Sequence, residues 1–129
     1  MKIDFAERAR ALVGTPFRPQ GRGPDGMDCV GVAIVTFGVP VDSVRSNYRL
    51  SGDHSSELRK QLEQYFGRVP SMRLRSGDLM LMKVSREQVH LGVRTQSGFV
   101  HAHAGLHMVV ETPGLPEWPL SAVYRKRRS

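Results

Sequence analysis

Apolar residues recur at helical spacing in two stretches of the first half of the chain. Residues 4–14 predict a first helix, in which Asp4 and Glu7 have capping-box spacing and Gly14 is a suitable stop. Residues 55–67 predict a clean amphipathic helix. Its expected inward side chains and its closing glycine are Leu58, Leu62, Tyr65, Phe66 and Gly67.

Between these two helices, residues 29–38 are apolar nearly all round, which fits a buried strand or a buried helix equally well by periodicity. Asp28 as an N-cap, and Gly38 followed by Pro40 as a stop, favour the helix. The preceding stretch, TPFRPQGRGPDGMD, holds three prolines and three glycines in fourteen residues and is predicted to be irregular. Residues 39–54 are predicted to form a loop.

After the amphipathic helix the apolar period changes from helical to two, which is the period of half-buried strands. The strand candidates are DLMLMKV, QVHLGVR, GFVHAHA, HMVVET and LSAVYRK, separated by turn signals such as Gln96-Ser97-Gly98. Helices first and strands afterwards predict an α+β fold, with N-terminal helices packed on a C-terminal antiparallel sheet of about five strands. We expect one domain over residues 1–129.

Composition narrows the functional classes. The single cysteine excludes an internal disulfide framework. The net charge of +7 favours polyanionic partners, but the nine aromatic residues are not interleaved with the basic ones, so we expect no nucleic-acid surface.

No stretch approaches the ~20 apolar residues of a membrane span, and the start lacks the apolar core of a signal peptide. We therefore expect neither a membrane span nor export by the usual signal.

The segment GRGPDGMDCVGVA can be interpreted in two ways. Gly21-x-Gly23-x-x-Gly26 has the glycine spacing of a dinucleotide-binding loop, but such a loop follows a strand within alternating β-α-β units. Here prolines precede the glycines and Pro24 lies among them, which disfavours a nucleotide site. We expect no cofactor.

In the second interpretation, the same loop delivers Cys29 to the first turn of a helix. Unpaired N–H groups and the helix dipole favour a thiolate there, and the thiolate is the nucleophilic form. A small buried hydrophobic residue is the alternative role for Cys29.

A cysteine nucleophile needs an imidazole within hydrogen-bond reach and a polar group to orient that imidazole. His90 points away from its apolar strand neighbours, and His101 shares a strand face with His103. If the two segments pair as a hairpin, His90 and His101 become near neighbours on one face. His54 is expected to be exposed in a polar loop. Zinc bound by Cys29, His90, His101 and His103 is an alternative, although the spacing matches no strong zinc motif.

These residues resemble the NlpC/P60 family of cysteine peptidases, which are small papain-like enzymes that cut bacterial cell-wall peptides. The family pattern runs GTPY…GG…DCSG, then GD, then HVGI and FIHA. Here the corresponding segments are GTPFRPQGRGPDGMDCVG, SGDLMLM, VHLGV and FVHA, over about residues 5 to 112. The segments YRL and VVETP further resemble the wall peptidases of phage tails and gene transfer particles.

The resemblance implies a fold and a set of roles. Cys29 resembles the nucleophile, His90 the general base and His101 the residue that orients the base. Cys29 and His90 are expected to share a proton as an ion pair. Phe17, Asp28 and Val30 are expected at the oxyanion and substrate pocket, where Phe17 replaces the usual tyrosine and Val30 the usual serine.

The implied substrate is a peptidoglycan stem peptide, cut at the γ-D-glutamyl–diaminopimelate bond, without a metal or cofactor. Phage tail proteins are the partners that the narrower resemblance implies, with the protein carried on a phage-like particle or acting in the periplasm. The alternatives are a structural tail component that lacks turnover, and an amidase or acyltransferase acting on a non-peptide substrate.

Overall fold

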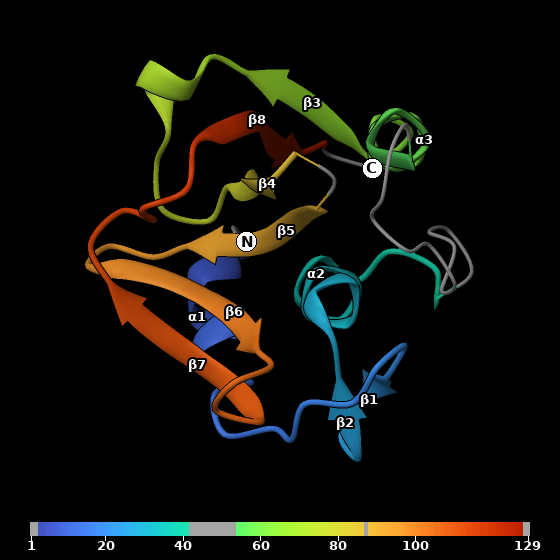
Figure 1. Cartoon of the computed structure of the whole chain (residues 1–129). Helices are drawn as coiled ribbons and strands as arrows, with labels where there is room; N and C mark the ends of the chain where they lie inside the picture. Colours follow the sequence, from blue (N-terminus) through green and yellow to red (C-terminus); the bar gives the residue numbers. More distant parts are fainter. Residues whose placement is uncertain (1–2, 42–53, 87, 128–129) are drawn as a thin grey trace.

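The structure is a computed structural model that describes residues 3–41, 54–86 and 88–127. It is an α+β fold in which helices pack against a large antiparallel sheet, as predicted (Figure 1). The elements are α1 Phe5–Arg10, β1 Arg22–Gly23, β2 Gly26–Met27, α2 Cys29–Phe37, α3 His54–Leu62, β3 Phe66–Val69, a 3-10 helix Ser71–Arg73, β4 Leu79–Ser85, β5 Gln88–Arg94, β6 Gly98–His103, β7 Met108–Pro113 and β8 Leu120–Lys126.

The large sheet has six strands in the order β3-β8-β4-β5-β6-β7, not the five expected. The additional strand is β3, which begins at Phe66 and pairs with β8 from Phe66↔Lys126 to Val69↔Val123. The predicted helix over residues 55–67 was therefore too long, because α3 ends at Leu62. Phe66 fits a helical spacing from Leu62, but pairing with β8 decides its conformation. His54 is the first residue of α3 rather than part of a loop.

The first helix is also shorter than predicted. Asp4 Oδ1 accepts a hydrogen bond from the Glu7 N–H at 3.1 Å, as its capping position predicts, but α1 ends at Arg10. The chain then turns at Gly14, where φ is +95°, and runs along β7. Gly14 N–H donates to the Val109 carbonyl at 2.9 Å, and the Val109 N–H donates to the Thr15 carbonyl at 2.8 Å.

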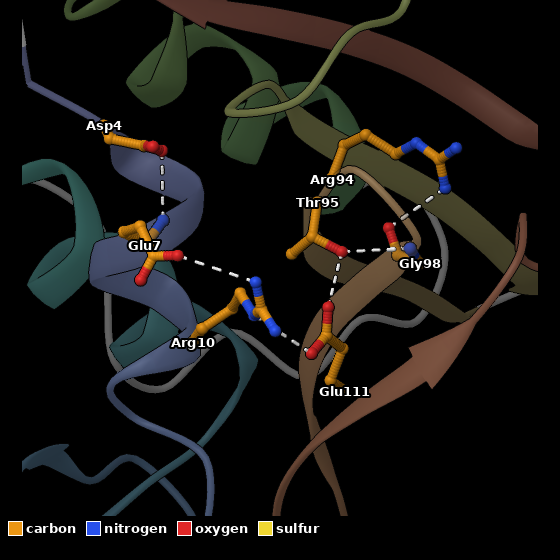
Figure 2. Close-up of polar contacts among 7 residues, drawn as sticks. All are labelled: Asp4, Glu7, Arg10, Arg94, Thr95, Gly98 and Glu111. Carbon is orange, nitrogen blue, oxygen red and sulfur yellow. Dashed lines mark hydrogen bonds and ion pairs between the residues drawn. The ribbon is translucent and has the colours of Figure 1, made fainter.

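Polar contacts join α1 to β7, which is one of the two edge strands of the sheet (Figure 2). Arg10 Nε lies 3.2 Å from Glu111 Oε1, and the Thr95 hydroxyl donates to Glu111 Oε2 at 2.6 Å. The Thr95 hydroxyl also accepts from the Gly98 N–H at 3.0 Å, where β6 begins. One carboxylate on β7 therefore links α1 to the turn between β5 and β6.

Residues 29–37, whose apolar pattern fitted a strand or a helix equally well, form a helix. α2 begins at Cys29, where Asp28 is the N-cap, and ends before Gly38, which adopts the left-handed conformation at φ +66°. Its side chains are buried almost all round, in agreement with its uniform apolar sequence. α2 packs against α1, β5 and β6. The loop predicted over residues 39–54 falls largely outside the described residues.

Apolar side chains gather on both faces of the sheet. The larger cluster joins α2 and α3 to alternate positions of the strands, among them Leu91 and Val100. The smaller cluster consists of Met80, Met82 and Phe99, with Leu74, Trp118 and Leu120 packed against it. Because strand side chains alternate between faces, His90 and His101 lie on the face of the smaller cluster.

Candidate active site

Two histidines from neighbouring strands meet in the structure. His90 on β5 and His101 on β6 lie with Nε2 of the first 2.9 Å from Nδ1 of the second. The hairpin that the sequence predicted therefore exists, and the two imidazoles are neighbours as predicted.

The two strands are joined only near their turn, through Val93↔Val100 and Arg94↔Phe99. Beyond these pairs β5 and β6 diverge, and α2 lies beside the wide end of the divergence, in contact with both strands (Figure 1). The histidine pair therefore bridges strands whose backbones no longer pair there.

Thr112 on β7 extends the histidine pair. Its Oγ1 lies 2.8 Å from His101 Nε2, so both ring nitrogens of His101 are engaged in hydrogen bonds. Thr112 was not predicted from the sequence. The signal was present in the period of two along VVETP, but the register between β6 and β7 depends on the length of the turn after His103.

Aromatic rings enclose the pair. Phe99 stacks on His101 with ring centroids 4.5 Å apart and an interplanar angle of 29°. Trp118 meets both imidazoles edge to face, at 5.8 Å from His90 and 6.4 Å from His101. His101 is only 2% exposed. Trp118 was also missed, because it lies in the irregular segment before β8 and no strand pattern places it.

This enclosure changes the protonation of both imidazoles. Burial, with smaller contributions from the neighbouring His101 and His103, lowers the pKa of His90 to about 3. Burial likewise lowers the pKa of His101 to about 4, with His103 adding to the effect. Removal from water disfavours the charged form of an imidazole. Both rings are therefore neutral at neutral pH, and one of them must donate the hydrogen bond that joins them.

Cys29 occupies the first position of α2, and the residue is 9% exposed within the larger apolar cluster. The carboxylate of Asp28 secures the helix start, because Oδ1 accepts from the Gly31 N–H at 2.8 Å and Oδ2 from the Gln20 N–H at 3.0 Å. Burial raises the pKa of Asp28, while these N–H bonds oppose the rise. α2 contacts the strands that carry the two histidines. Because Cys29 belongs to the larger cluster and His90 lies on the face of the smaller one, the two side chains can approach each other only where β5 and β6 diverge.

The glycines of the preceding loop serve close packing. A Cβ on Gly21 would lie 2.4 Å from the carbonyl oxygen of Gly26, and one on Gly31 would lie 2.2 Å from that of Gly21. Gly26 also has a positive φ of +155°. The loop thus folds on itself as the β1–β2 hairpin and presses against the first turn of α2. The glycine spacing is accounted for by this packing around the start of the helix.

The remaining residues expected at the pocket lie beside this loop. Phe17 is half-buried against the larger cluster, and its backbone forms a parallel bridge with Met27. Val30 is fully buried, so residue 30 can reach a ligand only through its backbone.

The third imidazole on β6 has a local hydrogen bond. His103 Nδ1 accepts from the Leu106 N–H at 3.1 Å, and its ring centroid lies 5.7 Å from that of His101. Within the described parts of the chain, no three His, Cys, Asp or Glu side chains gather as a metal-binding group. None of the helices found there is long and apolar enough to cross a bilayer.

No family model and no curated protein matches the sequence. Solved structures do match. NlpC1 from Trichomonas vaginalis superposes with a TM-score of 0.69 at 16% identity, over 95% of this chain and 42% of that one. The peptidoglycan hydrolase RipB from Mycobacterium tuberculosis superposes with a TM-score of 0.59 at 20% identity, over 95% and 62%.

A third match is RipD from Mycobacterium tuberculosis, described as a non-catalytic NlpC/p60 domain protein adapted to peptidoglycan binding. It superposes with a TM-score of 0.57 at 15% identity, over 95% of this chain and 94% of that one. The chain thus has the NlpC/P60 fold, and it spans less than half the length of NlpC1.

Proposed function

We propose that the chain is an NlpC/P60 catalytic domain that hydrolyses peptidoglycan stem peptides, at the γ-D-glutamyl–diaminopimelate bond. Cys29 is the nucleophile, His90 the general base and His101 the residue that orients His90. The observation that carries the proposal is the hydrogen-bonded pair of His90 and His101, on the two strands contacted by the helix that begins at Cys29. The similarity in fold to the peptidoglycan hydrolase RipB supports the choice of substrate.

The reaction is acyl transfer through a thioester. His90 takes the proton of the Cys29 thiol, and the sulfur attacks the amide carbonyl carbon. His90 then returns the proton to the leaving amine as the C–N bond breaks, and water hydrolyses the thioester. The low pKa of His90 supports a neutral resting pair, in which the proton moves during attack, rather than the ion pair expected from the sequence.

Stabilisation of the tetrahedral intermediate is assigned to backbone N–H groups in the first turn of α2. Phe17 has no hydroxyl to contribute, and the side chain of Val30 is buried in the core. The helix dipole and preorganised N–H groups favour a negative oxygen at this end of a helix. Asp28 holds that turn in place through its bond to Gly31.

The test is release of soluble peptides from purified peptidoglycan by wild type, Cys29→Ala and His90→Ala. We expect both variants to lose turnover while circular dichroism shows that they stay folded. Hydrolysis by Cys29→Ala at the wild-type rate would refute the catalytic role of the cysteine. Mass spectrometry of the released peptides identifies the bond that is cut.

A second candidate is peptidoglycan binding without turnover, as in a structural component of a phage-like tail. The similarity to non-catalytic RipD favours it, because the two chains match over nearly their whole lengths. This function predicts that wild type and Cys29→Ala sediment equally with peptidoglycan and that neither releases peptides.

A further inference from the structure

The hydrogen bonds around His101 form a continuous line across three strands. Thr112 Oγ1 on β7 lies 2.8 Å from His101 Nε2, and His101 Nδ1 lies 2.9 Å from His90 Nε2. The ring nitrogen of His90 outside this line is Nδ1. If His90 is the base, Nδ1 is therefore the atom that must accept the thiol proton.

Two arrangements of protons fit these distances, and only one leaves His90 able to act as a base. In the first, Nε2–H of His90 donates to Nδ1 of His101, and Nε2–H of His101 donates to the hydroxyl oxygen of Thr112. His90 Nδ1 then carries a lone pair. In the second, every donor and acceptor is reversed, and His90 Nδ1 carries a hydrogen and cannot accept another.

The aromatic neighbours do not select between the two arrangements. Phe99 stacks on the face of His101, and Trp118 meets the ring edge to face. Such contacts hold the plane of a ring but bond to neither nitrogen. The polar contact at Nε2 of His101 comes from Thr112, whose hydroxyl can donate in the second arrangement or accept in the first. The first arrangement is the one that the role of His90 as base requires, and in it Thr112 is the acceptor for the proton on Nε2 of His101.

We propose that Thr112 is a positioning residue that holds His101 as the Nε2–H tautomer, so that His90 presents an unprotonated Nδ1 to the thiol. This role rests on the proposed function, because the role of His90 as base is what selects this tautomer, but the tautomer of His101 can be measured without turnover. During attack, His90 Nδ1 gains the thiol proton while Nε2–H remains bonded to His101. Thr112 itself transfers no proton.

The test compares Thr112→Val, which keeps the shape and removes the hydroxyl, with Thr112→Ser, which keeps the hydroxyl. Nitrogen-15 NMR of histidine-labelled protein at neutral pH distinguishes the two tautomers of His101. We expect the Nε2–H form in wild type and in Thr112→Ser, and a mixture in Thr112→Val. The rate of peptide release should fall roughly tenfold in Thr112→Val and recover in Thr112→Ser.

Thr95→Val is the matched control. The hydroxyl of Thr95, like that of Thr112, forms hydrogen bonds, but its partners are Glu111 and Gly98 (Figure 2). Its loss should lower stability and leave the tautomer of His101 unchanged. Wild-type tautomer populations in Thr112→Val, or the Nδ1–H form in wild type, would overturn the proposal. If the NMR result is as expected while wild type releases no peptide, the proposed function fails and the assignment of Thr112 as the tautomer-holding residue stands.

Discussion

Lowering the pH from 7 to 5 should destabilise the protein through the buried histidine pair. The pKa of His90 is about 3 and that of His101 about 4 in the folded state, against 6.5 for an ordinary imidazole. The unfolded chain therefore binds protons at pH 5 that the folded chain does not. Stability is fully present above pH 6.5 and falls as the pH drops towards the folded pKa values.

The magnitude follows from the proton count. Each buried imidazole contributes a slope of about 1.4 kcal/mol per pH unit once the unfolded form is protonated, which integrates to about 2 kcal/mol between pH 7 and pH 5. The pair together gives about 4 kcal/mol, a large fraction of the 5–15 kcal/mol that is typical of a domain. Burial raises the pKa of Asp28, so its contribution has the opposite sign: the folded state binds its proton more readily than the unfolded chain does.

Urea unfolding followed by circular dichroism at pH 7, 6 and 5 measures this dependence. His101→Asn should remove about half of it, because one proton-binding difference is lost. His107→Asn is the matched control, since His107 is exposed and has a φ of +59°, a conformation that asparagine tolerates. A wild-type stability that does not change between pH 7 and pH 5 would refute the reasoning, as would equal slopes in wild type and His101→Asn.

Three substitutions test the framework around the site, each measured as the free energy of unfolding in urea. Asp28→Ala removes the acceptor of two backbone N–H bonds at the start of α2 and should cost about 1–2 kcal/mol; no change would show that the cap is dispensable. Asp78→Asn removes the charge of a buried carboxylate that Arg125 binds through two bonds of 2.8 Å, and should cost about 2 kcal/mol; Arg125→Ala should cost at least as much, because it leaves the Asp78 carboxylate, 2% exposed, without its cationic partner. Gly31→Ala places a Cβ 2.2 Å from the Gly21 carbonyl oxygen and should cost at least 2 kcal/mol. An unfolding midpoint equal to that of wild type would mean that the loop around Gly21 can move away from the new methyl group at little cost.

Local sequence signals predicted the elements whose conformation is decided locally. Asp28 and Gly38 correctly marked the ends of α2, since an N-cap and a left-handed C-cap act within one turn. The fate of Phe66 was not predictable in the same way, because its place in β3 depends on β8, nearly sixty residues later. The early end of α1 has the same origin, since the residues after it pair with β7.

The candidate site, too, was predictable only where local sequence signals decide the placement of a residue. The neighbourhood of His90 and His101 followed from a short hairpin, whose turn and strand period are both visible in the sequence. Thr112 and Trp118 escaped prediction because a second turn and an irregular segment decide their placement. The roles of Cys29 in catalysis and of Phe17 at the pocket remain predictions.

The intrinsic fluorescence of Trp118 can report on one face of the sheet. It is the only tryptophan in the chain, and its indole lies against the two imidazoles on the face of the sheet opposite the larger cluster. Its emission therefore records events on that face, whereas far-ultraviolet dichroism records the backbone of the helices and strands together. Unfolding curves from the two signals would coincide only if both faces of the sheet come apart together. Any separation between the curves would measure how independently the histidine side of the molecule opens.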